Sequence, residues 1–351
     1  MSLCYIIPTR DRPEVLSATL AALGALPRHD GHVIVADNAS AARPTLPRTL
    51  ANGLGVELIP LRSNAGAAAR NAAAMASDPG CEWLVMLDDD PAPMWLGHLE
   101  ALAAAGPAVA PVAAEVWPPA IKPAEPNPLD AATLGAIPAR SPALRTRREA
   151  GGLPEVFIGC GVAVRRAAFL AAGGYDHTFN FYAEEYDLAA KLLRAGGRVV
   201  LDRRFQVMHR KVAAGRDMNV ILERLVRNNG WVMQRYAPAR RRITELRRVI
   251  DRYGAIARKE RAELGYGHGR RELLSTLRHQ RRTPLPAPLW DRFTGKTVAR
   301  ASLERAWIRR GFRTAAIIDE GKNAHIIREV LRELGVREVP VSEANTLVIG
   351  T

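Results

Sequence analysis

The stretch LVMLDDD at residues 84–90 joins an apolar run directly to three carboxylates. The apolar run predicts a buried strand, and the adjacent like charges that follow must be hydrated, paired or bound to a cation. Asp88 and Asp90 are two positions apart, so their side chains point to the same side of an extended chain. Open α/β sheets bind ligands at the carboxyl ends of their strands. At that edge both side chains could reach one hard divalent ion, such as Mg²⁺.

Short apolar runs of the β type alternate with helical patterns on both sides of this stretch. The predicted strands span residues 3–7, 33–36, 56–60 and 83–87. Helices are expected after Pro13 and from about 65 to 75. This alternation predicts parallel strands with right-handed crossovers in a doubly wound, Rossmann-like sheet. Polar residues follow several strands, including Asp37, and are expected at one edge of the sheet.

The second half of the chain is less regular. Eight prolines between residues 114 and 154 predict a long irregular connection, which we interpret as a substrate-facing loop. The next predicted elements are a strand at 157–164, a helix at 184–195, short strands at 199–201 and 205–208, and a helix at 219–236.

A basic amphipathic helix follows, with apolar residues from Ile243 to Ile256 at helical spacing. We expect Gly265–Gly269 to interrupt it. The last elements predict a small α/β unit, with strand, helix and strand at 315–319, 324–334 and 346–349. The predicted domains are therefore 1–236, a basic helical segment at 237–289, and 290–351.

The chain has 351 residues, three widely separated cysteines and a formal net charge of +14. Sparse cysteines indicate reduced thiols rather than a disulfide framework. We expect no signal peptide and no transmembrane helix, and therefore a cytoplasmic protein.

Most of the excess charge lies in one segment, since residues 235–282 contain 15 Lys and Arg against 5 Asp and Glu. Three interpretations stay open: a solvated helical appendage, an anionic membrane surface at the inner membrane face, and nucleic acid. Nucleic acid is the least favoured, because no reading motif or aromatic platform accompanies the charge. The sequence leaves the oligomeric state open.

Seven short motifs and one histidine occur in a recognisable order. They are PTRDR (8–12), VADNAS (35–40), NAG (64–66), RN (70–71), LDDD (87–90), GGYD (173–176), EEYDL (184–188) and His209. This ordered set resembles the family-2 inverting glycosyltransferases with the GT-A fold, including bacterial rhamnosyl- and galactosyltransferases. The resemblance covers residues 1 to about 236.

The resemblance implies a UDP- or dTDP-sugar donor held at one edge of the sheet. The residues assigned to it are Pro8, Thr9, Arg12, Asp37, Asn64, Gly66, Arg70, Asp88 and Asp89. Among them, Asp37 would accept the imide N–H of the nucleobase, and Arg70 would lie near Asp37. Asp88, Asp90 and His209 would hold Mn²⁺ or Mg²⁺ against the diphosphate.

The resemblance also places the acid–base chemistry on Glu184 and Glu185. Glu185 stands where the family usually has Asp, and would take the proton from an acceptor hydroxyl. A neighbouring acid and partial burial would raise its pKa. Asp187 is expected to be structural. Gly159 and Gly161 would permit close approach of the chain, and Cys160 is expected to fill a small buried space.

The implied reaction is hexosyl transfer to a glycan, glycolipid or secondary metabolite. A glycosyltransferase-like fold that only binds or scaffolds is the main alternative, because Glu replaces the usual base. A sugar nucleotidyltransferase is disfavoured, because residues 9–13 lack the glycines that such enzymes carry after the first strand.

Overall fold

The computed structural model describes residues 1–117, 155–210, 217–318, 320, 323–344 and 346–349, and its core is an eight-stranded sheet. In spatial order the strands are β3 (Gly55–Pro60), β2 (His32–Asp37), β1 (Leu3–Thr9), β4 (Trp83–Met86), β7 (Val162–Arg165), β6 (Val109–Trp117), β8 (Arg198–His209) and β5 (Pro91–Pro93). The four neighbouring strands β3, β2, β1 and β4 are parallel. Strand β7 is antiparallel to both of its neighbours, β4 and β6, and β6 is parallel to β8. The predicted doubly wound α/β architecture is confirmed in the parallel half.

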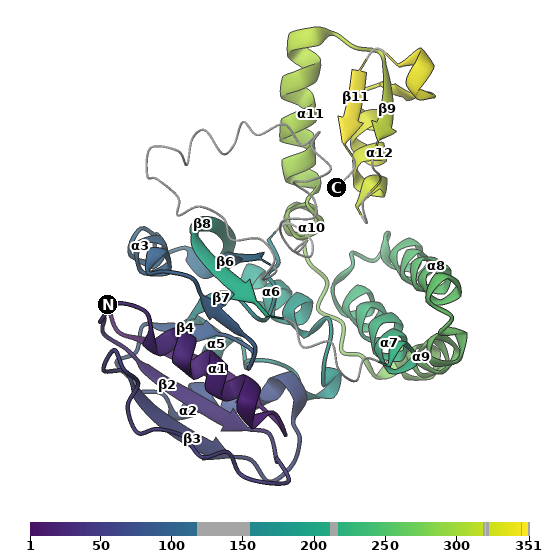
Figure 1. The fold of residues 1–351 in the computed structure, drawn as a ribbon. Helices are drawn as coiled ribbons and strands as arrows, with labels where there is room; N and C mark the ends of the chain where they lie inside the picture. Colours follow the sequence, from purple (N-terminus) through teal and green to yellow (C-terminus); the bar gives the residue numbers. More distant parts are fainter. Residues whose placement is uncertain (118–154, 211–216, 319, 321–322, 345, 350–351) are drawn as a thin grey trace.

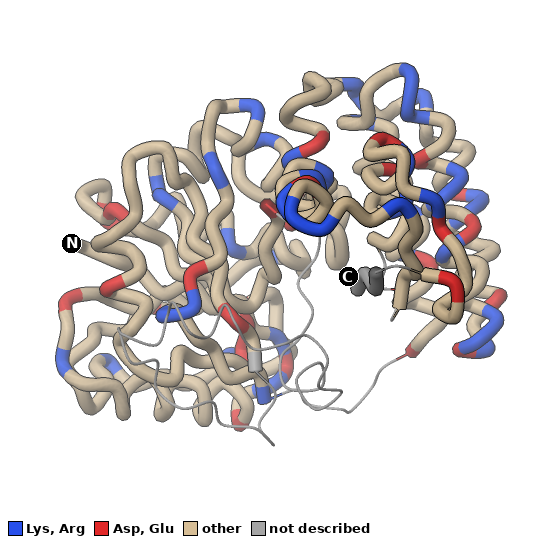
Figure 2. Tube along the Cα trace, turned by 90° about the horizontal axis from the view of Figure 1, so that it is seen from above, with Lys and Arg blue, Asp and Glu red and all other residues tan. Residues whose placement is uncertain are grey.

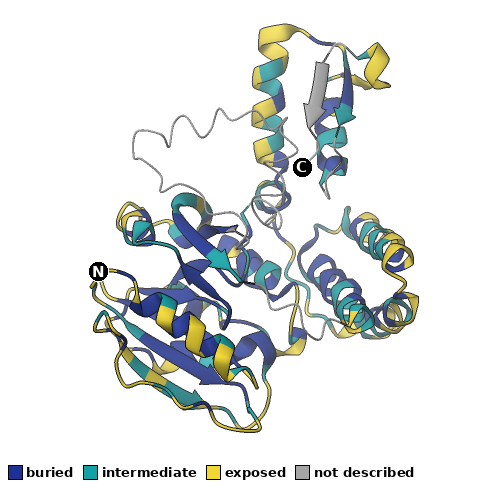
Figure 3. Cartoon of the chain, viewed as in Figure 1, coloured by how far each residue is buried: buried dark blue, intermediate teal, exposed yellow. Residues whose placement is uncertain are grey.

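Helices cover both faces of the parallel strands (Figure 1). Helix α1 (Pro13–Gly24) buries Leu16, Leu20 and Leu23 in one apolar cluster. The short η1 turn (Gly66–Ala68) and α2 (Ala69–Ala76) pack small alanine side chains into the cluster on the other face. Strands β1, β2 and β4 are almost entirely buried (dark blue in Figure 3), whereas the edge strand β3 alternates between half-buried and exposed residues. Thr9 and Asp37 pair in register at the carboxyl ends of β1 and β2, so the polar edge predicted from the sequence exists.

The strands beyond β4 differ from the prediction. Residues 114–117 belong to β6, and the rest of the predicted loop, 118–154, lies outside the described residues. Only the end of the predicted strand 157–164 is strand, in β7, whereas the two predicted short strands are one continuous β8. Strand β6 alternates valines with alanines and a proline, and it pairs with β7 on one side and β8 on the other.

Helices make up most of the remaining chain. They are α3 (Gly97–Ala103), α5 (Arg166–Ala171), η3 (His177–Phe179), α6 (Glu184–Arg194), α7 (Met218–Tyr236), α8 (Arg242–Glu260), α9 (Glu263–Thr276) and η4 (Leu277–His279). No helix of the described residues has both the length and the apolarity needed to cross a membrane. Lys and Arg gather on the side of the molecule away from the N-terminus, where the helical segment lies (Figure 2).

The predicted interruption at Gly265–Gly269 is wrong, because these residues lie inside α9. A Cβ on Gly265 would lie 2.0 Å from the carbonyl oxygen of Asn219, and one on Gly269 would lie 2.1 Å from that of Glu223. The glycines therefore let α9 pack directly against the backbone of α7. This contact stabilises the helical conformation more than glycine's low helix propensity weakens it.

The C-terminal part contains the predicted small α/β unit. Its elements are α10 (Ala287–Thr294), α11 (Lys296–Arg310), β9 (Thr314–Ile318), α12 (Ala324–Glu333), β10 (Arg337–Glu338), η5 (Val341–Glu343) and β11 (Thr346–Ile349). The three strands are parallel in the order β10-β9-β11. Trp290 and Phe293 of α10 belong to the core of the large sheet, so the boundary predicted at residue 290 falls within a helix that packs on that core.

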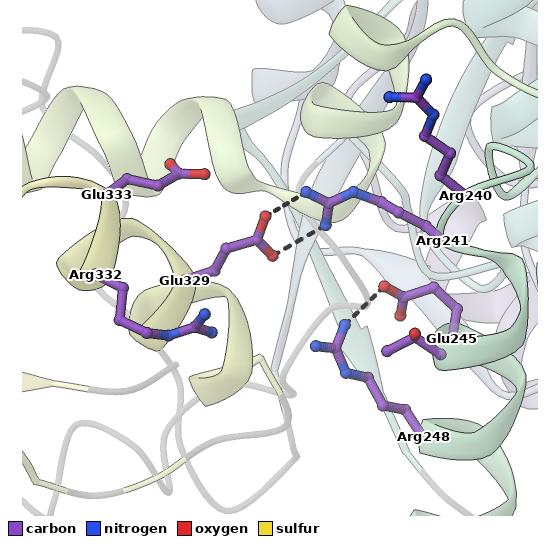
Figure 4. Close-up of a pocket in the computed structure, with 8 residues that line it drawn as sticks. Arg240, Arg241, Glu245, Arg248, Glu329, Arg332 and Glu333 are labelled. Carbon is purple, nitrogen blue, oxygen red and sulfur yellow. Dashed lines mark hydrogen bonds and ion pairs between the residues drawn. The ribbon is translucent and has the colours of Figure 1, made fainter.

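An ion-pair network connects this unit to the start of α8 (Figure 4). Glu329 of α12 accepts a hydrogen bond from Arg241 at 2.9 Å and another from Lys296 at 2.6 Å. A cavity of about 480 Å³ lies beside these side chains. The hydrogen bond from Arg241 lowers the pKa of Glu329 to about 2, in spite of partial burial, with Lys296 adding to the effect.

We predict that Glu329→Gln lowers the free energy of unfolding at pH 7 by about 1–3 kcal/mol, because it removes one charge from a partly buried network. Since folding lowers the pKa of Glu329, the stabilisation is present above pH 4.5 and is lost as the pH falls toward 2. Urea denaturation at pH 7 and pH 3 measures both effects. Glu304→Gln removes an exposed pair with Arg300 and is the control; an equal loss in that variant would contradict the assignment.

Candidate active site

The three carboxylates after β4 face different cations. Strand β4 ends at Met86, and residues 87–90 are not extended, so the alternation that predicted Asp88 and Asp90 on one side does not apply. Asp88 forms an ion pair with Arg70. Asp89 accepts a hydrogen bond from Thr9 Oγ1 at 3.0 Å and pairs with Arg12. Each carboxylate thus contacts a basic side chain, and Arg12 is shared by Asp89 and Asp90.

Asp90 contacts the histidine at the end of β8. Its Oδ1 lies 3.2 Å from Nε2 of His209, and its Oδ2 lies 3.4 Å from Arg12. Burial opposes ionisation of Asp90, but the hydrogen bond and charge of His209, together with Arg12, lower its pKa. The neighbouring Asp89 differs, because burial raises its pKa to about 6 in spite of Arg12 and Thr9.

Asp88, Cys160 and His209 form a group with metal-binding potential, because one donor atom from each lies within 4.8 Å of the others. Cys160 Sγ is 3.9 Å from Nδ1 of His209. Of the three predicted ligands, Asp88 and His209 are in this group, and Asp90 touches it through His209. The sequence analysis missed Cys160, whose position depends on β7 lying between β4 and β6.

Asn38 organises the predicted donor-binding loop. Its side chain accepts a hydrogen bond from Ala65 N–H at 2.7 Å and donates one to the carbonyl oxygen of Gly66 at 3.0 Å. Asn64 Oδ1 accepts from Gly66 N–H at 2.9 Å. Gly66 has a φ of +59°, and a Cβ there would lie 2.3 Å from the carbonyl oxygen of Asn180. Asn38 is thus a positioning residue that the predicted site set did not include.

The ionic partner of Arg70 in the structure is Asp88, whereas the sequence-based prediction placed Arg70 near Asp37. Its guanidinium is buried and donates to the carbonyl oxygen of Leu87 at 3.0 Å beside its ion pair with Asp88. Burial opposes the charge of Arg70, but Asp88, Tyr175 and Glu184 raise its pKa. The difference arises because α2 directs this side chain toward the end of β4. Asp37 instead accepts a hydrogen bond from Ser40 N–H at 3.1 Å.

Glu184 and Glu185 begin α6 after two residues with left-handed backbone, Tyr182 (φ +74°) and Ala183 (φ +65°). Such conformations are costly for non-glycine residues and often occur at functional sites. Glu184 is buried, and its Oε2 has no hydrogen-bond partner among the described residues. Burial, followed by the charge of Glu185, raises the pKa of Glu184 well above its usual value.

Glu185 is half-buried and accepts a hydrogen bond from Gly159 N–H at 3.3 Å. Burial raises its pKa as well. Asp187, one turn into the helix, is structural as predicted. It accepts hydrogen bonds from Tyr236 at 2.7 Å and Arg235 at 2.9 Å, and pairs with Lys191.

The segment Gly159–Gly161 joins the two parts of the site. The N–H of Gly159 binds Glu185, while the thiol of the next residue, Cys160, faces His209. The edge of the sheet therefore brings together a carboxylate–imidazole–thiol group, the buried Glu184, the half-buried Glu185, and two arginines, Arg12 and Arg70. This arrangement combines a candidate cation site with a carboxylate able to accept a proton.

Residues 4–170 match the family model "Glycosyl transferase family 2". The resemblance inferred from the sequence is confirmed over these residues. The match ends before Glu184, Glu185 and His209. No curated protein matches the chain.

Solved glycosyltransferase structures share the fold. The chain is similar to TarS 1–349 of S. aureus, with 13% identity, a TM-score of 0.50, and coverage of 95% of this chain and 91% of that one. It is also similar to GalNAc-T7 with UDP, GalNAc and Mn²⁺, with 16% identity, a TM-score of 0.50, and coverage of 81% and 55%. A mannosyltransferase from Pyrobaculum calidifontis gives 16% identity, a TM-score of 0.47, and coverage of 95% and 86%. The GT-A fold expected from the sequence is confirmed.

Proposed function

We propose that this glycosyltransferase moves a sugar from UDP or dTDP to an acceptor hydroxyl with inversion at the anomeric carbon. The observation that carries the proposal is the segment Gly159–Gly161, which holds Glu185 on one side and faces His209 on the other. Inverting transfer needs a base on the acceptor side and positive charge at the leaving diphosphate. Glu185, the candidate base, and His209, at the candidate metal site, both lie next to this segment.

The donor side of the proposal rests on the ends of β1 and β2. Thr9 and Asp37 close these strands, and Asn38 fixes the loop that contains Asn64 and Gly66. Pro8 and these residues would surround the nucleobase and ribose. Arg12 would add positive charge near the diphosphate. The GalNAc-T7 structure that shares the fold contains UDP, which supports a uridine donor.

The donor set suits a divalent ion, because carboxylates and an imidazole lie together at the end of β4. Asp88, Asp90 and His209 would hold Mn²⁺ or Mg²⁺, with Asp89 reaching the donor. When bound, such an ion stabilises the charge that develops on the leaving diphosphate. The presence of Mn²⁺ in the GalNAc-T7 structure supports this assignment.

Glu185 is the proposed general base. Its carboxylate would take the proton from the acceptor hydroxyl as that oxygen attacks the anomeric carbon opposite the leaving diphosphate. Burial raises its pKa toward the working range, which strengthens it as a base. Burial, together with the charge of Glu185, raises the pKa of the neighbouring Glu184 well above its usual value.

We predict that Glu185→Gln keeps donor affinity and lowers turnover by about 10²-fold or more, the contribution of a general base. Glu185 must be ionised to accept a proton, so the turnover of the wild type should rise as the pH increases through the raised pKa of Glu185. Steady-state kinetics measures turnover, and UDP titration measures donor affinity. The control is Asp30→Asn, which changes an exposed carboxylate far from Glu185 in the sequence. Near-normal turnover of Glu185→Gln would move the role to another residue. Donor binding without turnover in the wild type would favour a binding module.

We predict that Asp88→Asn and Asp90→Asn abolish the part of donor binding that depends on Mn²⁺. A ligand that binds only the native state raises its melting temperature. UDP with Mn²⁺ should therefore raise the melting temperature of the wild type and of Asp30→Asn more than UDP with a chelator does. The two aspartate variants should show no such difference. A metal-dependent shift that persists in both would contradict the metal assignment.

The helical segment is proposed to contact an anionic membrane surface. Arg271 of α9 and Arg278 of η4 are exposed, as are the apolar residues Leu264 and Leu274 of α9. Exposed basic and apolar side chains on one helical segment are found in helices that lie in a membrane interface. Such contact would suit a lipid-linked acceptor.

We predict that the chain sediments with vesicles containing anionic lipid and not with neutral vesicles. Each arginine near an anionic surface is worth about 1 kcal/mol, so Arg271→Glu with Arg278→Glu should weaken binding by about tenfold or more. Arg43→Glu, exposed in the N-terminal part, is the control. Equal binding to neutral vesicles would contradict the proposal, and DNA binding in a gel shift would favour nucleic acid instead.

A further inference from the structure

The donor atoms beside His209 differ in their chemistry. Asp88 offers a carboxylate oxygen, His209 an imidazole nitrogen and Cys160 a sulfur, all within 4.8 Å of one another. Cys160 is 2% exposed, so its thiol faces the site from the protein interior. Hard cations such as Mg²⁺ take oxygen ligands, whereas thiolate and imidazole suit borderline and soft transition ions.

We propose that Cys160 is a direct ligand of the metal ion, and that this ion is a first-row transition metal rather than Mg²⁺. The inference rests on the metal dependence proposed above and extends it to a residue that carries no assigned role.

The imidazole of His209 is oriented for this role. Its Nε2 lies 3.2 Å from Asp90, and its Nδ1 lies 3.9 Å from the sulfur of Cys160. The contact with Asp90 orients the ring so that Nδ1 faces the thiol.

The backbone fixes the thiol in place. Gly161 N–H donates to the carbonyl oxygen of Ile158 at 3.1 Å, and the carbonyl oxygen of Gly161 accepts from Ala114 N–H at 2.9 Å. On the other side of Cys160, Gly159 N–H binds Glu185. A ligand held on a fixed backbone needs little reorganisation when the ion binds.

The other two thiols of the chain serve as internal controls. Cys4 lies near the start of β1, and Cys81 precedes β4. Both therefore lie toward the amino ends of parallel strands, at the edge of the sheet opposite the site. Both are buried, and Cys81 directs its thiol toward the carbonyl oxygen of Trp83. A sulfur–metal band that came from Cys4 or Cys81 would be lost on substitution of that cysteine, and it could therefore be distinguished from a band due to Cys160.

The test uses Co²⁺ as the probe with the reduced full-length chain. Cobalt bound to a thiolate gives an intense near-ultraviolet charge-transfer band, which oxygen and nitrogen ligands do not produce. We expect the band in the wild type and in Cys81→Ser, and its loss in Cys160→Ser. Calorimetry should show Co²⁺ affinity falling by about tenfold or more in Cys160→Ser, the scale of a lost metal contact. Millimolar Mg²⁺ should not displace Co²⁺ from the wild type.

The wild-type spectrum alone can overturn the inference, whether or not Cys160→Ser folds. No Co²⁺ binding, binding without the band, displacement by Mg²⁺, or a band that persists in Cys160→Ser would each do so. Failure of the proposed function looks different. A protein that binds UDP with Mn²⁺ but shows no band contradicts only the thiolate ligand. A protein that shows the band but does not bind UDP contradicts the donor.

Discussion

The structure depends on how three adjacent carboxylates are accommodated at the end of a central strand. Repulsion between Asp88, Asp89 and Asp90 would oppose burial unless each charge had its own partner. The partners come from three separate elements: Arg12 caps α1, Arg70 lies in α2, and His209 ends β8. Because Arg12, Arg70 and His209 all contact the triplet, the starts of α1 and α2 and the end of β8 meet at one place on the sheet. That place is the proposed donor site.

The second concentration of negative charge is accommodated differently. Among the described residues, no ion pair is made by Glu184 or Glu185, and burial raises the pKa values of both. Arg70 connects the two regions, since the charges of both Asp88 and Glu184 act on it. Basic side chains thus lie against the carboxylates of the triplet, whereas burial dominates at the glutamate pair. This division suits a site with a charged donor on one side and an acceptor hydroxyl on the other.

Local patterns predicted the parallel half of the fold, because apolar runs and the polar residues after them depend only on neighbours in the sequence. The features that were missed depend on contacts between distant segments. Gly265 and Gly269 suggested a break, yet the backbone of α7 makes glycine favourable there. Arg70 was expected near Asp37, but the direction of α2 places it beside Asp88. Cys160 gave no signal, because its neighbour His209 lies in another strand.

The glycines around Cys160 have a structural role that explains their sequence positions. A Cβ on Gly159 would lie 3.0 Å from Glu185 Oε1, and a Cβ on Gly161 would lie 3.1 Å from Cβ of Ala114. With a Cβ at either position, Glu185 or Ala114 would have to give by a few tenths of an ångström, or the segment would have to move. Because the backbone is continuous, a displacement that moved the N–H from Glu185 would also move the thiol from His209. The proposed base and the proposed metal site therefore share one support, and the geometry of each limits the geometry of the other.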